Sequence, residues 1–186
     1  DAIVDLGDLL PTYIELAAEQ VPENLDGTSL VPLFKNQDER IKKYSFSIQT
    51  TLGIGKGQPY GIRAVVSDKY RYIWNLTPEA QFLNLINNTE DIASSRWDIK
   101  WYQSWREKAQ EDSWAKELLT KFRERPKEEL YDVVNDKWCM NNLADNPQYE
   151  KIKSELRREL LNWMEECGDK GHETELEAKE HKFINK

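Results

Sequence analysis

Near its end the chain reads Glu128-Glu129-Leu130-Tyr131-Asp132-Val133-Val134-Asn135-Asp136, and soon afterwards Asn141-Asn142-Leu143-Ala144-Asp145. The first run combines the apolar and β-branched residues of a strand with the Asn and Asp that favour a turn. The second run is typical of a short helical turn. The segment that follows, Pro147–Glu166, starts with Pro, has Gly168 beyond its end and repeats apolar residues at helical spacing. A strand followed by a long amphipathic helix is therefore predicted.

Three earlier segments also have strand patterns. Lys43–Thr51 alternates apolar and polar residues, and Tyr60–Val66 and Tyr70–Leu76 flank Ser67-Asp68-Lys69 as the two arms of an antiparallel hairpin. With Glu129–Val134 they predict an α+β fold, built on an antiparallel sheet of about four strands. We expect the C-terminal helix to cover the inner face of this sheet through its apolar stripe, which contains Ile152, Leu156, Leu160 and Trp163.

The chain divides into three predicted regions. Residues 1–34 contain a helix over Ile3–Ala18, capped by Asp5 or Asp8, and form the end of a larger domain or a junction. Residues 35–171 form the main subdomain, with a helical insertion at 78–125, and residues 172–186 form a charged tail. Because Asp1 lies inside the helical pattern, we expect the chain to be a piece of a longer protein.

Composition excludes several classes of protein. The net charge is −8, whereas nucleic-acid binders present a basic face. The two cysteines and two histidines are scattered, which excludes a zinc site. No apolar run has the length of a membrane span, so no membrane partner is expected.

The sequence offers no catalytic constellation and no metal ligands, because no nucleophile, base and orienting group can be assembled. The Gly-rich loop before Tyr60 lacks the Gly-Lys-Ser/Thr of a phosphate loop. Its Lys56 and Gln58, with Tyr60, are the candidate contacts for a sulfated or carboxylated sugar. A plain solvated loop is the alternative interpretation. Arg63, in a strand between apolar residues, is expected to pair structurally with a carboxylate.

Two other patterns have a structural and a functional interpretation. Trp97, Trp101 and Trp105 are spaced by four residues, which favours a core position for at least two of them over a sugar-stacking platform. Asn75 and Asn87 stand in Asn-x-Thr sequons, which often occur by chance.

Four blocks in order resemble the type I sulfatases and together cover about Ile3 to Gly168. They are Val4-Asp5-Leu6 with Leu10-Pro11-Thr12; Leu25-Asp26-Gly27-Thr28-Ser29-Leu30; Ile62-Arg63-Ala64-Val65-Val66 with Lys69-Tyr70; and Glu129-Leu130-Tyr131-Asp132 with Asn142-Leu143-Ala144 and the C-terminal helix. Within that family, Trp74-Asn75-Leu76 and the long Trp-rich insertion are most similar to the heparan N-sulfatases, the N-sulfoglucosamine sulfohydrolases of glycosaminoglycan degradation.

The resemblance implies an exported enzyme (periplasmic, extracellular or lysosomal) in two parts. Its large part holds a Cys/Ser-x-Pro-x-Arg motif, whose first residue becomes formylglycine, and the ligands of a calcium ion. Here Cys139 precedes Met140-Asn141 and Cys167 precedes Gly168-Asp169, so neither fits that motif. We therefore expect this chain to be the scaffold and substrate-cleft wall of a hydrolase of sulfated saccharides, inactive alone and partnered by the N-terminal catalytic domain.

A non-enzymatic carbohydrate-binding or interaction module, with the Trp-rich insertion as its surface, is the alternative. An upstream coding region with Cys/Ser-x-Pro-x-Arg distinguishes the first hypothesis from the second.

Overall fold

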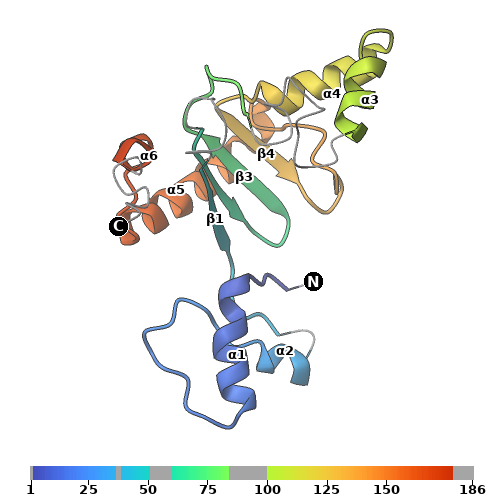
Figure 1. Ribbon diagram of the computed structural model, residues 1–186. Helices are drawn as coiled ribbons and strands as arrows, with labels where there is room; N and C mark the ends of the chain where they lie inside the picture. Colours follow the sequence, from blue (N-terminus) through green and yellow to red (C-terminus); the bar gives the residue numbers. More distant parts are fainter. Residues whose placement is uncertain (1, 37–38, 51–59, 84–99, 178–186) are drawn as a thin grey trace, which may run out of the picture. The chain divides into compact units, whose positions relative to one another are not determined.

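The computed structural model describes residues 2–36, 39–50, 60–83 and 100–177. These residues form a four-stranded sheet, a long helix after it and several short helices (Figure 1). By packing, the chain separates into two compact units. The first comprises Asp1–Ser47, Ala64–Tyr72 and Leu130–Glu159, and the second comprises Ile48–Arg63, Ile73–Glu129 and Leu160–Lys186. Within the described residues, no helix is both long and apolar enough to cross a membrane.

The sheet has the order β1-β2-β3-β4, with β1 at Ser45–Gln49, β2 at Ile62–Val66, β3 at Tyr70–Asn75 and β4 at Glu128–Asp132. Main-chain hydrogen bonds from Ser67 N to Tyr70 O (2.8 Å) and from Leu76 N to Gly61 O (3.0 Å) close the β2–β3 hairpin. Strands that follow one another in the chain are thus neighbours in the sheet. The predicted antiparallel sheet and its α+β class are confirmed.

The long helix α5 spans Glu150–Glu166 and follows a 3₁₀ turn, Pro147–Tyr149. Asn146 begins this turn, because its side chain accepts a hydrogen bond from Gln148 N (3.0 Å). Leu156, Leu160 and Met164 are buried along one stripe, as the spacing predicted. Burial of these residues is what stabilises the helix, since an isolated helix of this length is marginal in water.

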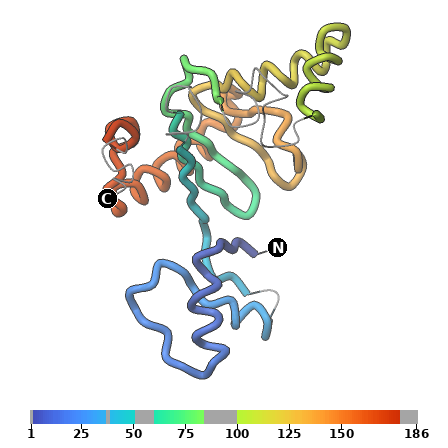
Figure 2. The backbone as a smooth tube through the Cα atoms, viewed as in Figure 1, coloured from blue at the N-terminus to red at the C-terminus, as the bar shows by residue number. Residues whose placement is uncertain are grey.

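In the first unit, α1 (Leu9–Leu16) follows a 3₁₀ turn at Leu6–Asp8 and is accompanied by α2 (Val31–Lys35). Asp5 is the N-cap of the turn: its carboxylate accepts from Gly7 N, while Asp8 accepts from Asp5 N, so the predicted cap is confirmed. The backbone trace in Figure 2 shows the long connection between α1 and α2.

In the second unit, the predicted helical insertion contains α3 (Lys100–Lys108) and α4 (Ser113–Arg123). The buried ring of Tyr102 contacts Trp105 and Phe122, with ring centroids 6.4 Å apart in both pairs. Part of the predicted tail is also ordered. Its first six residues form α6, His172–Glu177, and Glu175 is buried there because it has a cationic partner.

Candidate functional site

The predicted sugar-binding residues lie at or near the segment between β1 and β2. Lys56 and Gln58 fall outside the described residues. Tyr60 is fully buried, and its ring packs edge-on against Phe82 with centroids 5.4 Å apart. Burial raises the pKa of Tyr60 to about 12. This position disfavours the predicted contact of Tyr60 with a sugar and makes the residue an anchor of the strand end.

Glu175 of α6 holds the chain on both sides of the 51–59 segment. Its Oε2 accepts from Thr50 Oγ1 at 2.5 Å, and its Oε1 accepts from Arg63 Nη1 at 2.8 Å. Gly61 passes so close that an added Cβ would lie 2.7 Å from Glu175 Cγ. Only glycine fits at this point, and one carboxylate thereby fixes the chain before and after the segment.

Arg63 is the cation of this cluster, and only 1% of its residue surface is exposed. Besides Glu175, its guanidinium donates two hydrogen bonds to Asp169, one of them from Nη2 to Oδ1 at 3.1 Å and the other from Nε. The predicted structural pairing of Arg63 is therefore confirmed. Burial alone would raise the pKa of Asp169, but hydrogen bonds from Arg63 and from Gly171 N outweigh it and lower that pKa.

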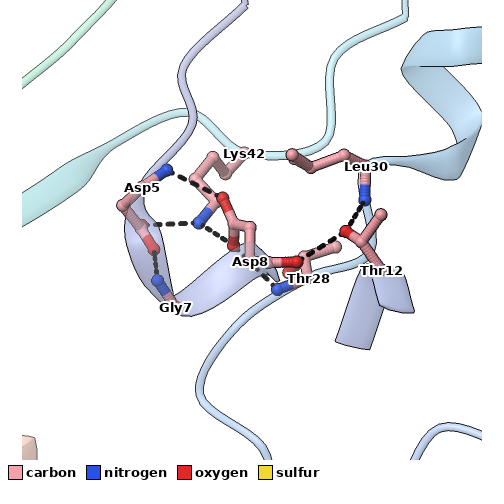
Figure 3. Close-up of polar contacts among 7 residues, drawn as sticks. All are labelled: Asp5, Gly7, Asp8, Thr12, Thr28, Leu30 and Lys42. Atoms are coloured by element: carbon pink, nitrogen blue, oxygen red, sulfur yellow. Dashed lines mark hydrogen bonds and ion pairs between the residues drawn. The ribbon is translucent and has the colours of Figure 1, made fainter. Parts of the chain in front are cut away.

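A second buried charge cluster lies in the first unit (Figure 3). Lys42 Nζ donates to Asp8 Oδ1 at 2.6 Å and to Asp5 Oδ2 at 2.7 Å. The Asp8 side chain is completely buried and also accepts from Thr28 N at 2.9 Å. Lys42 is compensated by two carboxylates, and the cluster holds the 25–30 turn against the start of α1 through the bond from Thr28 N to Asp8.

Thr12 adds a polar link on the same side of α1. Its Oγ1 donates to Asp8 O at 2.5 Å and accepts from Leu30 N at 2.8 Å. The buried residues of α1 are Pro11 and Thr12, whereas Leu10, Tyr13 and Leu16, with Leu6 in the preceding 3₁₀ turn, face solvent. An amphipathic helix of a complete domain has the reverse arrangement.

The two sequons have different outcomes. Asn75 is fully buried, and its amide donates to Glu129 Oε1 and Pro126 O, both at 2.6 Å. This side chain is inaccessible to a glycosyltransferase in the folded chain. Asn87 lies outside the described residues.

Two of the three tryptophans at four-residue spacing, Trp101 and Trp105, lie within the described residues. Trp105 is half-buried and contacts Phe122, whereas Trp101 is 52% exposed. The prediction that at least two of the three are core residues now depends on Trp97, which is outside the described residues.

The described part of the chain contains no group of three or more His, Cys, Asp or Glu residues placed to hold a metal ion. The implied calcium therefore has no fitting ligand set in those residues. The sites found here can fix loops, neutralise buried charge and present surfaces. They have no nucleophile placed beside a base.

Sequence comparison finds sulfatases among the relatives of this chain. Two ulvan-active sulfatases from Formosa agariphila are 29% and 25% identical to it, over 90% and 94% of its length. The chain spans only 30% and 27% of those two proteins. An uncharacterized protein from Haemophilus influenzae is 22% identical and is covered to 60%. No protein-family model matches the chain.

Solved structures with the same fold include sulfatases. A 2-O GAG sulfatase superimposes with a TM-score of 0.52 and 23% identity, over 87% of this chain and 25% of that one. A further structure, solved in complex with D-glucosamine-2-N,6-O-disulfate, gives a TM-score of 0.52 with 16% identity, over 88% and 24%. These structures show the fold, and each is much longer than the segment it shares.

Proposed function

We propose that this chain is the C-terminal portion of a sulfatase that hydrolyses sulfate esters or N-sulfates of sulfated saccharides, in which it forms the scaffold and one wall of the substrate cleft. One observation carries this proposal. The match to an ulvan-active sulfatase runs through 90% of the chain but only 30% of that relative. The remainder of such a protein is large enough to contain a complete catalytic domain.

The catalytic chemistry belongs, on this proposal, to the N-terminal part. That part supplies the formylglycine and the calcium ion that the resemblance implies. The chain described here contributes neither, since Cys139 and Cys167 lack the Pro and Arg of the motif. We also propose that the whole protein is exported, as the saccharide substrates of such enzymes lie outside the cytoplasm.

The exposed apolar residues of α1 and of the turn before it support the proposal of a large polypeptide partner. Leu10, Tyr13 and Leu16 of α1 are exposed, and Leu6 in the preceding 3₁₀ turn is 86% exposed. Leaving such a face in water forgoes about 25 cal/mol for every Å² that burial would remove. The polar groups of Asp8 and Thr12 are satisfied inside, so a shift of the helix cannot bury the apolar face without breaking them. We infer that the catalytic part of the same protein covers it.

Within this proposal, Lys56 and Gln58 are the residues of the cleft wall that bind the saccharide. The support is that the two ends of their segment, between β1 and β2, are fixed: Thr50 and Gly61 both contact Glu175, and Tyr60 is buried between them. A loop on a rigid base is a common location for substrate contacts. A lysine there offers a point charge to an anionic sugar.

N-sulfated glucosamine is the narrower substrate proposal, from the resemblance of Trp74-Asn75-Leu76 and the Trp-rich insertion to the heparan N-sulfatases. Parallel assays with N-sulfated and O-sulfated glucosamine test it. Preference for the N-sulfate supports the proposal, and turnover of the O-sulfate alone refutes it.

The main test compares the 186-residue chain with the same chain extended by the coding region upstream of Asp1. We expect turnover of an aryl sulfate or a sulfated glucosamine by the extended protein only, abolished when the Cys or Ser of its Cys/Ser-x-Pro-x-Arg motif is replaced by Ala. Turnover by the 186-residue chain contradicts the proposal. A coding region that starts near Asp1 without this motif favours the binding-module alternative.

A further inference from the structure

Trp138 is the most exposed large apolar residue after Leu6, with 85% of its surface in solvent. It lies in the turn that follows β4, a segment in which Val134 and Met140 are also exposed. The turn is well fixed. The carboxylate of Asp136 accepts from Met140 N at 3.0 Å and from Asn141 N at 2.8 Å. These bonds fix the backbone of the turn, so binding a ligand there orders little main chain.

Two cations accompany this ring. Arg71 of β3 donates from Nη1 to Cys139 Sγ at 3.6 Å, which brings its guanidinium next to the residue that follows Trp138. Lys137 precedes Trp138 and forms no ion pair with the residues that the structure describes. Both cations are exposed, and both line a cavity of about 680 Å³ whose walls include Val133 and Val134 but not Trp138, which lies outside that lining.

The cavity has mixed chemistry. Asp68 is its acidic residue, while Arg71 and Lys137 give it an excess of positive charge. The whole chain carries a net charge of −8, so this excess is a local feature. Trp138 lies in the chain between Lys137 and the Cys139 that Arg71 contacts. An exposed indole ring at this place can cover the C–H face of a pyranose, while the two cations pair with its sulfate or carboxylate groups.

We propose that Trp138, Arg71 and Lys137 form a binding site for a residue of an anionic polysaccharide. The inference rests on the proposed function for the identity of the polymer, but not for the existence of the site. Trp and Arg are also common in protein interfaces, whereas lysine is depleted at their buried centres, so Lys137 is the residue that favours a polysaccharide over a protein partner. The apolar face of α1 already offers a surface suited to a protein.

The test is affinity electrophoresis of the 186-residue chain in gels containing dextran sulfate, with uncharged dextran as the reference polymer. We expect retardation by dextran sulfate, and a dissociation constant about tenfold weaker for Trp138→Ala, as for loss of one strongly contributing aromatic contact. Arg71→Ala and Lys137→Ala should each reduce the salt dependence of the retardation, because each removes one cation.

Trp114→Ala is the matched control, since Trp114 is also exposed but lies on α4 in the other unit. It should leave the retardation unchanged. Equal retardation of Trp138→Ala and the unmutated chain overturns the proposal. The proposal is also overturned if Trp138→Ala no longer associates with the separately produced upstream part while its binding to dextran sulfate is unchanged. Neither polymer assay requires turnover, so failure of this site and failure of the proposed sulfatase function are separate results.

Discussion

Arg63 and Glu175 are 112 positions apart in the sequence and form a buried ion pair, with Nη1 and Oε1 2.8 Å apart. The pair joins the first residues of β2 to α6 in the second unit. Removing one partner of such a pair leaves a buried charge with fewer compensating groups, which typically costs several kcal/mol. Asp169 remains on Arg63 and limits the loss.

Glu175→Ala should therefore lower the free energy of unfolding by about 3 kcal/mol. The measurement is urea denaturation followed by circular dichroism. Glu173→Ala is the control, because Glu173 stands on the same helix but pairs with Lys170 in solvent. An exposed pair contributes about 0–1 kcal/mol. Equal effects of the two substitutions would contradict the structural role of Glu175.

Asp8 should make the chain sensitive to acid. Burial tends to raise its pKa, but hydrogen bonds from Lys42, Thr28 N and Asp5 N outweigh burial and lower that pKa below the ordinary 3.8. A carboxyl whose pKa is lower in the folded state stabilises the fold above its unfolded pKa, and this contribution disappears as pH falls through the folded pKa. Asp8→Asn should cost about 2 kcal/mol at pH 7 and progressively less below about pH 4.

Urea midpoints measured across this pH range test the prediction. Glu19→Gln is the control, since Glu19 is exposed. A deficit of Asp8→Asn that persists at full size well below pH 4 would mean that packing, and not the Lys42 pair, accounts for it.

Tyr60 should make the chain sensitive to alkali. Burial raises its pKa from 10.0 to about 12. A group with a raised pKa contributes stability below its unfolded pKa, and the contribution is lost as pH rises through the folded pKa. Between about pH 10 and 12 the unmutated chain should lose up to about 3 kcal/mol that Tyr60→Phe does not lose. Thermal unfolding across this range measures it, with the exposed Tyr13→Phe as the control. Parallel pH profiles for Tyr60→Phe and the unmutated chain would show that Tyr60 ionises normally.

The fully buried Leu160 of α5 should be essential to the core. Leu160→Ala should cost about 2–5 kcal/mol, the range for a large-to-small change that leaves a cavity. Its neighbour Leu161 is 41% exposed, and Leu161→Ala should cost no more than about 0.5 kcal/mol. Chemical denaturation distinguishes the two. A small loss for Leu160→Ala would mean that the sheet and α5 do not share a packed core.

The fold was largely predictable because its elements have strong periodic patterns. The stripe of α5 depends only on which residues are apolar, and Leu156 and Leu160 are buried as that stripe predicted. The alternation in β1 predicted the strand but not its burial, since Ile48 is 51% exposed. The polarity of α1 was not predictable in this way. Its apolar residues have helical spacing, but the spacing alone does not say whether the covering surface lies within the described residues.

In the candidate site, the partners of Arg63 show what could not be predicted from the sequence. A strand arginine between apolar residues requires a carboxylate, and this requirement can be read locally. Asp169 and Glu175, however, are 106 and 112 positions away in a charged stretch, where neighbouring acids such as Glu173 look equivalent. Only the tertiary fold distinguishes them. For the same reason the sequence did not reveal that the ring of Tyr60 packs against Phe82.

Lys56 should bind the saccharide in the extended protein without taking part in bond cleavage. An ammonium that contacts substrate and transition state equally contributes to KM and leaves kcat unchanged. Lys56→Ala should therefore raise KM for a sulfated saccharide by about tenfold, the change expected when a charge-assisted contact of about 1.5 kcal/mol is lost. Lys108→Ala, an exposed lysine on α3, is the control for the general loss of positive charge. Steady-state kinetics at two salt concentrations measure the effect, which should shrink at high salt because screening weakens the contact. An unchanged KM would make Lys56 a solvated surface residue, and a fall in kcat alone would place it at the scissile group instead.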